Sequence, residues 1–203
     1  MKLYYSPGAC SMASHISLLE IDQPVELVKT DIRAKKTQDG RDFREINRLG
    51  YVPALELDGG EILTENGAIL PYIAGLRPGT LAPTGDALSD ARLHEVLGFL
   101  SSELHKSFSP FFGPLEGAAR EAALEKLRSR IGHVEYLLGD GRDYLFGDQF
   151  SVADAYAFVI LSWTRAFDIS LDEWPSVAAF VRRVAQRPAV IKAMAEEGLL
   201  ETA

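Results

Sequence analysis

The stretch LYYSPGACSMASHISLLEIDQPVELV, residues 3–28, decides the fold of the first part of the chain. Leu3–Tyr5 is typical of a short strand that the breaker Ser6-Pro7-Gly8 ends. Ser11–Glu20 carries apolar residues at helical spacing, and Val25–Val28 alternates like a second strand. A strand, a helix and a strand in this order predict a parallel pair of strands with a helix between them.

The residues that follow extend this unit with a hairpin and a helix. Ala54–Leu57 and Glu61–Leu63 flank Asp58-Gly59-Gly60, a pattern typical of two antiparallel strands joined by a tight turn. Glu65–Gly75 is predicted to be helical, with Thr64 as its cap. Between these pieces and the first unit, we expect a loop at residues 31–40 and a short helix at residues 44–48. The predicted order is β-α-β-α-β-β-α, with a mixed four-stranded sheet.

Beyond residue 76 the pattern changes from alternating elements to helices alone. The segment before residue 87 holds two prolines and no periodicity, as in a linker. Apolar residues then recur at spacings of three and four, and the predicted helices are Leu93–Phe108, Leu124–Leu138, Ser151–Arg165, Pro175–Arg187 and a short one after Pro188. Ser151 and Asp154 fit a capping box, which is a folding role. The expected division is a domain at residues 1–77, a linker at 78–86 and an all-α domain at 87–203.

The composition is that of a soluble globular protein. The 203 residues hold 21 Lys+Arg and 29 Asp+Glu, a formal net charge of −8. This acidic balance argues against nucleic acid or an anionic membrane as the main partner, and no apolar run reaches the roughly 18 residues of a membrane span. One cysteine cannot pair within the chain. Because Pro7-Gly8 interrupts the start before any signal-peptide pattern forms, we expect a cytoplasmic protein with a reduced thiol.

Cys10 is the first candidate for chemistry. It stands between the first predicted strand and the following helix, so its sulfur is expected to face free N–H groups and the positive end of the helix dipole. Both lower a thiol pKa from its usual value of about 8.5. The alternative is a buried, inert cysteine, which the small and turned Pro7-Gly8-Ala9 disfavours. Ala13 stands where a redox dithiol would need its second cysteine, so this thiol acts alone.

Val52-Pro53, at the start of the third predicted strand, is the second candidate. Proline cannot donate to a sheet, so it belongs at the first residue of a strand or at an edge. If the bond before it is cis, the N–H and C=O of Val52 could pair with a bound peptide as an added strand. The sequence alone favours a plain strand-starting proline.

Thr64-Glu65-Asn66-Gly67, at the start of a predicted helix, is the third. An acidic residue there is most often a cap or a complement to the helix dipole. The free N–H groups and the Asn66 amide could instead hold a carboxylate while Glu65 holds an ammonium group. Together they would suit the free end of an amino acid.

A fourth candidate lies on the first predicted helix of the second domain. Ser102, His105 and Lys106 stand at i, i+3 and i+4, away from the apolar stripe, so they are expected to share one polar face. A plainly solvated face is the alternative. Gly98, a mid-helix glycine that costs about 1 kcal/mol against alanine, indicates close approach by another group. The remaining histidines lack metal-ligand spacing, and no metal site is expected.

Taken together, these motifs resemble the cytosolic glutathione S-transferases, and specifically their bacterial beta class. The matching stretches are YYSPGACS at 4–11, GYVPAL at 50–55, LTE at 63–65 with Ala68-Ile69, SELHK at 102–106 and SVAD at 151–154. They reach across essentially the whole chain. The first stretch and the His-Lys motif are specific to the class, whereas the Val-Pro and Ser-x-x-Asp pieces are shared more widely.

The resemblance implies a thioredoxin-like domain that binds glutathione, an all-α domain, a homodimer and a detoxification role. It places Cys10 beside the glutathione sulfur, able to form a mixed disulfide with it. Val52, before a cis Pro53, pairs with the cysteinyl backbone of glutathione. Glu65 and its neighbour Asn66 hold the γ-glutamyl end.

By the same resemblance, Lys35 lies near the glycine carboxylate of glutathione and Glu103 reaches across the dimer. Ser102, His105 and Lys106 approach the sulfur. The implied catalytic residues are Cys10, His105 and Lys106, and the implied glutathione-binding residues are Tyr5, Ala9, Cys10, Ser11, Lys35, Tyr51, Val52, Pro53, Glu65, Asn66, Gly98, Ser102, Glu103 and His105.

Two positions depart from the class. Asn66 stands where a small residue such as serine is usual, and Gly98 stands where an asparagine is common. If that asparagine normally donates near the thiol, its loss bears on the rate of conjugation more than on glutathione binding.

The expected function is transfer of glutathione to a hydrophobic electrophile. Its thiolate, with its pKa lowered by N–H donors, His105 and Lys106, attacks an electrophilic carbon. The residues expected around the electrophile include Phe108, Phe111, Phe112 and Trp163. Two alternatives stay open: thiol–disulfide exchange at Cys10, and non-catalytic binding of glutathione or hydrophobic compounds, to which Gly98 points.

Overall fold

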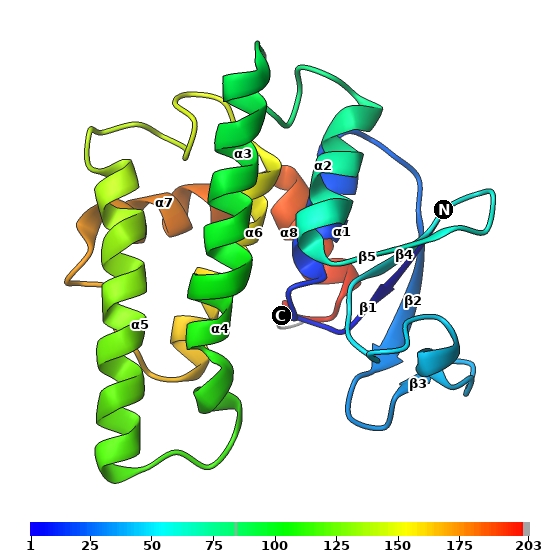
Figure 1. The fold of residues 1–203 in the computed structure, drawn as a ribbon, viewed down its shortest axis with the longest axis horizontal. Helices are drawn as coiled ribbons and strands as arrows, with labels where there is room; N and C mark the ends of the chain where they lie inside the picture. Colours follow the sequence, from blue (N-terminus) through cyan, green and yellow to red (C-terminus); the bar gives the residue numbers. More distant parts are fainter. Residues whose placement is uncertain (84, 201–203) are drawn as a thin grey trace.

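The computed structural model describes residues 1–83 and 85–200. Residue 84 of the expected linker and residues 201–203 of the expected second domain lie outside the described residues. Figure 1 shows a twisted sheet with helices α1 and α2 beside it, and a group of longer helices on the other side of those two.

The first unit has the predicted strand, helix and strand. β1 (Lys2–Tyr5) is followed by α1 (Met12–Glu20) and β2 (Glu26–Asp31). β1 and β2 pair in parallel, with Leu3 opposite Leu27, so the prediction of a parallel pair is confirmed.

The sheet has five strands in the order β3-β2-β1-β4-β5, so the predicted number of four is wrong. β4 (Ala54–Glu56) and β5 (Ile62–Thr64) form the predicted hairpin, and β4 pairs antiparallel with β1. The additional strand is β3 (Lys36–Thr37), inside the stretch expected to be a loop. β2 runs on to Asp31, whose carboxylate accepts the next N–H groups and turns the chain back onto β2. A strand of two residues is too short to show any alternation.

Two local expectations in the first domain need correction. The predicted short helix is a single 3₁₀ turn, η1 (Phe43–Glu45), capped by Asp42. Helix α2 (Asn66–Leu76) has Glu65 rather than Thr64 as its N-cap residue, and no side chain caps it. Thr64 instead ends β5, opposite Ala54, and is therefore held in the sheet.

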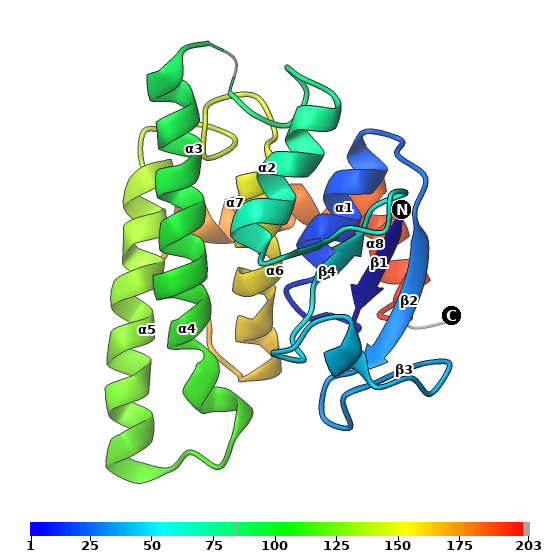
Figure 2. The ribbon, with the colours of Figure 1, turned by 45° about the vertical axis from the view of Figure 1, so that its right-hand side comes forward.

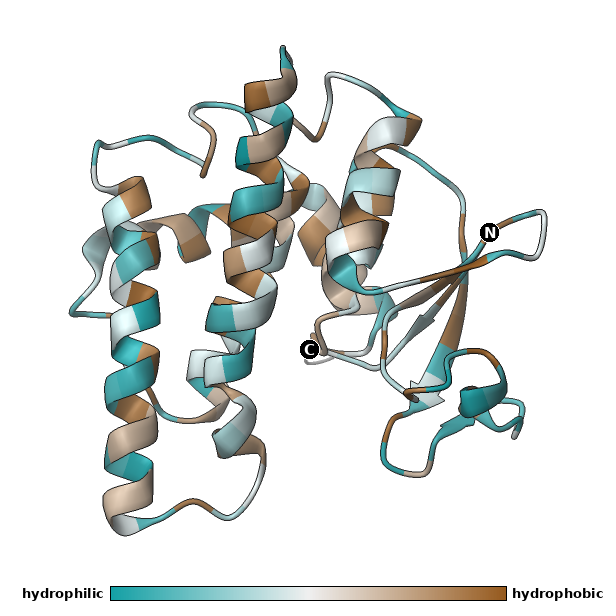
Figure 3. Cartoon of the chain, viewed as in Figure 1, coloured by the Kyte–Doolittle hydropathy of each residue, from teal (hydrophilic) through white to brown (hydrophobic). Residues whose placement is uncertain are grey.

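The described residues after α2 form helices joined by loops, which confirms the predicted all-α part. Its elements are α3 (Ala87–Phe99), η2 (Leu100–Leu104), α4 (His105–Ser107), η3 (Ser109–Phe112), α5 (Gly117–Leu138), α6 (Val152–Ala166), α7 (Pro175–Ala185) and α8 (Pro188–Glu196). α3 and α5 lie side by side in two views (Figures 1 and 2). Figure 3 shows apolar and polar residues alternating along both helices, as expected for helices with one buried face. Among the described residues, no helix combines the length and apolarity of a membrane span.

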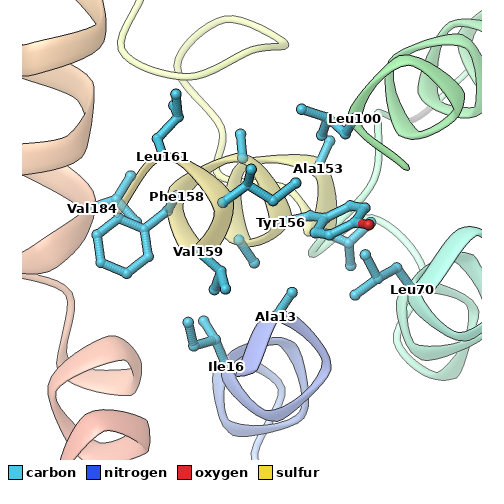
Figure 4. Packing of buried hydrophobic residues seen from close by; sticks show 14 of the residues in the cluster. Ala13, Ile16, Leu70, Leu100, Ala153, Tyr156, Phe158, Val159, Leu161 and Val184 are labelled. Atoms are coloured by element: carbon cyan, nitrogen blue, oxygen red, sulfur yellow. The ribbon is translucent and has the colours of Figure 1, made fainter. Parts of the chain in front are cut away.

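Helix α6 forms the centre of the main core. Figure 4 shows its side chains packed against Ala13 and Ile16 of α1, Leu70 of α2 and Val184 of α7. The predicted capping box starts this helix: the Ser151 N–H donates to Asp154 Oδ2 over 2.8 Å, and the Ser151 hydroxyl accepts from the Asp154 N–H. α6 thereby packs against both parts of the chain and fixes the position of its own side chains between them.

Candidate active site

The loop between β1 and α1 is closed by its own hydrogen bonds. The Ala9 N–H donates to Ser6 O over 3.0 Å, and the Ser6 N–H donates to the Ser11 hydroxyl over 3.2 Å. Ser11 is completely buried. Its hydroxyl therefore shapes the loop, and only its backbone N–H faces the Cys10 sulfur.

Gly8 fastens this loop to the helical part of the chain. Its N–H donates to Glu197 Oε2 over 2.9 Å, and its C=O accepts from Trp163 Nε1 over 2.8 Å. Its φ of +67° lies in the left-handed region that favours glycine. Two distant segments, the end of α8 and α6, therefore fix the loop that presents Cys10.

The expectation of a lowered Cys10 pKa is wrong. The N–H groups of Cys10 and Ser11 do lower it, as predicted for a helix start, and so does the charge of Lys106. Burial and the Glu65 carboxylate outweigh them and raise the pKa of the thiol to about 12. The small loop residues leave Cys10 half-buried, and loss of hydration destabilises a thiolate more than two N–H groups stabilise it. Cys10 is a protonated thiol at neutral pH.

The Val52-Pro53 peptide bond is cis, as the resemblance implied. Cys10 Sγ lies 3.3 Å from Val52 O and donates to it. The N–H of the buried Val52 meets no acceptor within residues 1–83 and 85–200. An N–H left free in a buried residue is costly unless a ligand accepts from it.

Lys35 lies along the loop that precedes Pro53. Its ammonium donates to Gly50 O over 2.9 Å and sits 5.1 Å from the centre of the Tyr51 ring. A Cβ at Gly50 would come within 2.8 Å of the Lys35 side chain, and φ there is +64°, so only glycine fits. Tyr51 is exposed, and its ring and the ammonium form one surface beside Val52.

Glu65 and Asn66 take different roles at the start of α2. Glu65 is exposed, has a φ of +69°, and its carboxylate acts on the Cys10 thiol. Asn66 is buried, and its amide is bonded on both sides: Nδ2 donates to Cys10 O over 2.9 Å, and Oδ1 accepts from the Ser14 hydroxyl over 3.0 Å. The expectation that the Asn66 amide holds a carboxylate is therefore wrong, because that amide already fixes Cys10. The backbone N–H groups of Asn66 and Gly67 meet no acceptor in the described part of the chain.

His105 faces the site from the helical part. Its Nδ1 lies 2.9 Å from the Tyr156 hydroxyl, and its ring packs edge-on against Trp163 with centroids 4.9 Å apart. Burial, together with the neighbouring charge of Lys106, lowers the pKa of His105 to about 4. The imidazole is therefore neutral at pH 7, whereas Lys106 is exposed and acts on Cys10 by its charge.

The other members of the expected polar helix face do not join this group. Gly98 is exposed, and a Cβ there would meet open space, so no other described part of the chain approaches it closely. Its carbonyl accepts from the Ser102 hydroxyl over 2.8 Å. Between Gly98 and His105 the helix widens into the π turn η2. The wider turn shifts the helical phase, so His105 turns inward while Ser102 stays in solvent.

Two further expected residues are held elsewhere. Glu103 pairs with Arg130 of α5 over 2.8 Å, so its carboxylate has a partner within its own chain. Tyr5 is buried, with its ring 6.4 Å from that of His15 and its hydroxyl near Glu196 and Glu197. Ala9, by contrast, lies in the Cys10 loop and is half-buried.

An aromatic cluster lies next to His105. Phe108 and Phe112 pack edge-on against Trp163, with centroids 5.6 and 5.4 Å apart. Phe111 and Phe167 lie 5.6 Å apart and complete the cluster. Phe112 is exposed, so one aromatic face opens to solvent. The structure thus brings together the four residues expected around the electrophile and adds Phe167.

Sequence reasoning missed Tyr156, Phe167 and Glu197. Tyr156 stands in an apolar run of α6, where a tyrosine reads as core, and 51 residues separate it from His105. Glu197 binds a residue 189 positions away. No local pattern marks either contact. No cluster of three or more metal-ligating side chains occurs in the described ranges.

The chain matches known families and structures over nearly its full length. Residues 1–75 match the glutathione S-transferase N-terminal domain, and residues 99–188 match the glutathione S-transferase C-terminal domain. It is 39% identical over 202 residues to glutathione S-transferase GstA of Escherichia coli O157:H7, covering 98% of this chain and 100% of that one. It is 38% identical over 208 residues to glutathione S-transferase GST-4.5 of Xanthomonas campestris, with the same coverage.

Solved structures agree with these relatives. The bacterial glutathione S-transferase BphK, in a ternary complex, is 48% identical with a TM-score of 0.93, over 98% of this chain and 100% of that one. A beta-class glutathione S-transferase from Sphingomonas chungbukensis is 44% identical with a TM-score of 0.92 and the same coverage. A sphingomonad enzyme complexed with glutathione is 46% identical, with a TM-score of 0.91 and the same coverage. This chain belongs to the glutathione S-transferase family, which confirms the membership that its motifs predict.

Proposed function

We propose that this protein is a glutathione transferase that joins the thiolate of glutathione to a hydrophobic, aromatic electrophile. The observation that carries the proposal is the position of His105. It lies between Tyr156 and Trp163, and Trp163 both belongs to the aromatic cluster and binds Gly8 O of the Cys10 loop. A neutral donor beside an apolar surface suits a reaction between a thiolate and an apolar molecule. The names of the relatives support the same activity.

The residues around Cys10 fit glutathione. The unpaired N–H of Val52 suits a peptide carbonyl, and the unpaired N–H groups of Asn66 and Gly67 suit the γ-glutamyl carboxylate. The exposed Glu65 carboxylate suits the ammonium group of that same end. Lys35 lies beyond Val52 and offers a cation for the glycine carboxylate. We assign these four contacts to glutathione, with Tyr51, Pro53 and Ala9 shaping the walls.

The chemical step needs a thiolate and a leaving group. The thiol proton of glutathione passes to water, and the sulfur then forms a bond to the electrophilic carbon. With an aryl halide, the carbon–halogen bond breaks and the halide leaves with the bonding pair. His105 as a donor and Lys106 as a nearby charge stabilise the thiolate and lower its pKa.

Thiol–disulfide exchange at Cys10 is the weaker alternative. The attacking species in that reaction is a thiolate, and burial with Glu65 keeps the Cys10 thiol protonated. The raised pKa therefore favours a role for Cys10 as a neutral neighbour of the glutathione sulfur.

Steady-state conjugation of glutathione to an activated aryl halide tests the proposal. We expect turnover by the wild type and by Cys10→Ala, with kcat within about tenfold of each other, since Cys10 does not supply the nucleophile. Turnover by neither protein would overturn the transferase proposal for this class of electrophile. Turnover by the wild type alone, together with reduction of a glutathionyl mixed disulfide, would favour exchange at Cys10.

We further propose a homodimer in the cytoplasm, with domain limits at residues 77 and 87. The homodimer rests on the family resemblance, the domain limits rest on the segment without periodicity at residues 78–86, and the location rests on the composition with its single cysteine. Because Glu103 is already paired with Arg130, a contact across the dimer would have to share or replace that partner. Light scattering of the purified protein, with Glu103→Gln as the variant, tests both points: a monomeric wild type would contradict the dimer, and an unchanged dimer in the variant would exclude Glu103 from holding it together.

A further inference from the structure

We infer that Tyr156 is a positioning residue that holds His105 in a single tautomer, with the proton on Nε2. The catalytic consequence rests on the proposed function. The tautomer itself does not.

A single hydrogen bond joins Tyr156 of α6 to His105. Both a tyrosine hydroxyl and a neutral imidazole can donate or accept, so the direction of this bond decides which ring nitrogen of His105 carries the proton.

The Tyr156 hydroxyl belongs to a buried residue. Its proton needs an acceptor in the protein, because a buried donor without a partner is costly. The hydrogen-bond partner of this hydroxyl within the described residues is His105 Nδ1, 2.9 Å away. Tyr156 therefore donates to the imidazole.

An imidazole that accepts at Nδ1 and is neutral must carry its proton on Nε2. His105 is neutral at pH 7 because burial and Lys106 hold its pKa low. Nε2 has no hydrogen-bond partner in residues 1–83 and 85–200, so its N–H is available to a ligand. The Trp163 ring packs edge-on against the imidazole and restricts its rotation.

Helix α6 fixes the position of Tyr156, and Tyr156 in turn binds His105. Figure 4 shows the Tyr156 ring between Leu100 and Leu70 with its oxygen pointing away from α6. Tight apolar packing of the ring, which is 2% exposed, fixes where the hydroxyl lies. The donor on His105 is therefore set in place before any ligand arrives.

Nitrogen NMR of the imidazole side chains tests the tautomer without any substrate. We expect the His105 resonances, assigned by their loss in His105→Asn, to show a protonated Nε2 and an unprotonated Nδ1. In Tyr156→Phe, which removes only the hydroxyl, we expect a shift toward a mixture of both tautomers. Tyr136→Phe, at an exposed tyrosine of α5, is the matched control and should leave the His105 resonances unchanged. A proton on Nδ1 in the wild type, or unchanged resonances in Tyr156→Phe, would overturn the inference.

Kinetics then test whether the tautomer matters for turnover. We expect Tyr156→Phe to lower kcat about tenfold to a hundredfold, in the range for partners that orient an imidazole, with little change in KM for glutathione. Placed on His105→Asn, the same change should cost nothing further, because Tyr156 acts through His105. Equal losses in both backgrounds would contradict a positioning role. If the wild type shows no turnover at all, the proposed function fails while the NMR result stands on its own.

Discussion

Two histidines flank the Cys10 loop, and they differ in what surrounds them. His15 of α1 is completely buried, with Nδ1 3.1 Å from Glu197 and Nε2 2.8 Å from Glu196. His105 has no carboxylate partner within residues 1–83 and 85–200 and meets the hydroxyl of Tyr156 instead. Glu197 also accepts the Gly8 N–H, so the pair of His15 and Glu197 holds the Cys10 loop in place.

The difference shows how one residue type serves structure in one place and chemistry in another. With both ring nitrogens bonded to carboxylates, His15 has no N–H left for a ligand and can only bind parts of the chain together. His105 has one nitrogen bonded within residues 1–83 and 85–200, so its second ring nitrogen is left for a ligand beside the aromatic cluster. The hydrogen-bond partners therefore distinguish a structural role for His15 from a chemical role for His105. Each role predicts a different result when the imidazole ring is removed by mutation.

The largest effect on stability is expected at His15. In His15→Asn, the buried Glu197 loses its partner, and breaking a buried pair from one side costs about 3 kcal/mol in the free energy of unfolding. Chemical denaturation followed by circular dichroism measures this. Glu197→Gln is the matched control, because it keeps an acceptor for Gly8 and should cost less, about 1 kcal/mol. An equal or smaller loss in His15→Asn than in the control would show that the pair does not hold the loop.

The largest effect on turnover is expected at His105. His105→Asn removes the donor that we assign to the glutathione sulfur and should lower kcat about a hundredfold, the usual effect of losing a positioned proton donor. Its free energy of unfolding should fall by only about 1 kcal/mol, for the lost bond to Tyr156. Conjugation kinetics and chemical denaturation of the same samples measure these two effects. A variant that loses stability but keeps kcat would reverse the assignment of the two histidines.

A pH dependence of stability follows from the low pKa of His105. Between pH 6.5, the ordinary value, and about 4, the unfolded chain binds a proton on this ring while the folded chain does not. Stability therefore falls as the pH drops through this window, with a slope of up to about one proton. His105→Asn should remove that part of the slope. Denaturation at several pH values compares the two proteins, and identical slopes would mean that His105 is not held neutral.

The comparison of the two histidines also shows what the sequence could predict. Features set by neighbouring residues were accessible: the strand–turn–helix around Cys10, the hairpin, and the Ser151–Asp154 cap all follow from patterns within a few positions. The family motifs added the cis Pro53. The partners of His15 and His105 were not accessible, because they lie 182 and 51 residues away along the chain.

The prediction of a lowered Cys10 pKa failed for a different reason. The N–H groups that the sequence predicts are present and act in the predicted direction. Their effect is smaller than that of burial and of Glu65, and the depth of burial depends on how the loop packs against α6 and α8. Likewise, the π turn that directs His105 inward leaves the spacing of the residues unchanged and has no mark in the sequence.

The smallest effect is expected at Cys10 itself. Its pKa of about 12 means that alkylation by iodoacetamide is slow at neutral pH and rises tenfold with each pH unit up to pH 9. A thiol with the usual pKa of about 8.5, such as that of free glutathione measured alongside, levels off in this range. The rate is read by mass spectrometry, with Cys10→Ala as the blank. A plateau of the alkylation rate below pH 9 would show a lowered pKa and would make Cys10 a reactive thiol.

Variants of its charged neighbours sharpen this result because they act in opposite directions. Glu65 raises the pKa of Cys10 and Lys106 lowers it. Glu65→Gln should therefore speed alkylation severalfold, and Lys106→Gln should slow it. Both variants change exposed side chains, so neither alters the burial of the thiol. If both rates stay at the wild-type value while the slope persists, burial alone holds the proton on Cys10, and the charges around the site act on the glutathione sulfur instead.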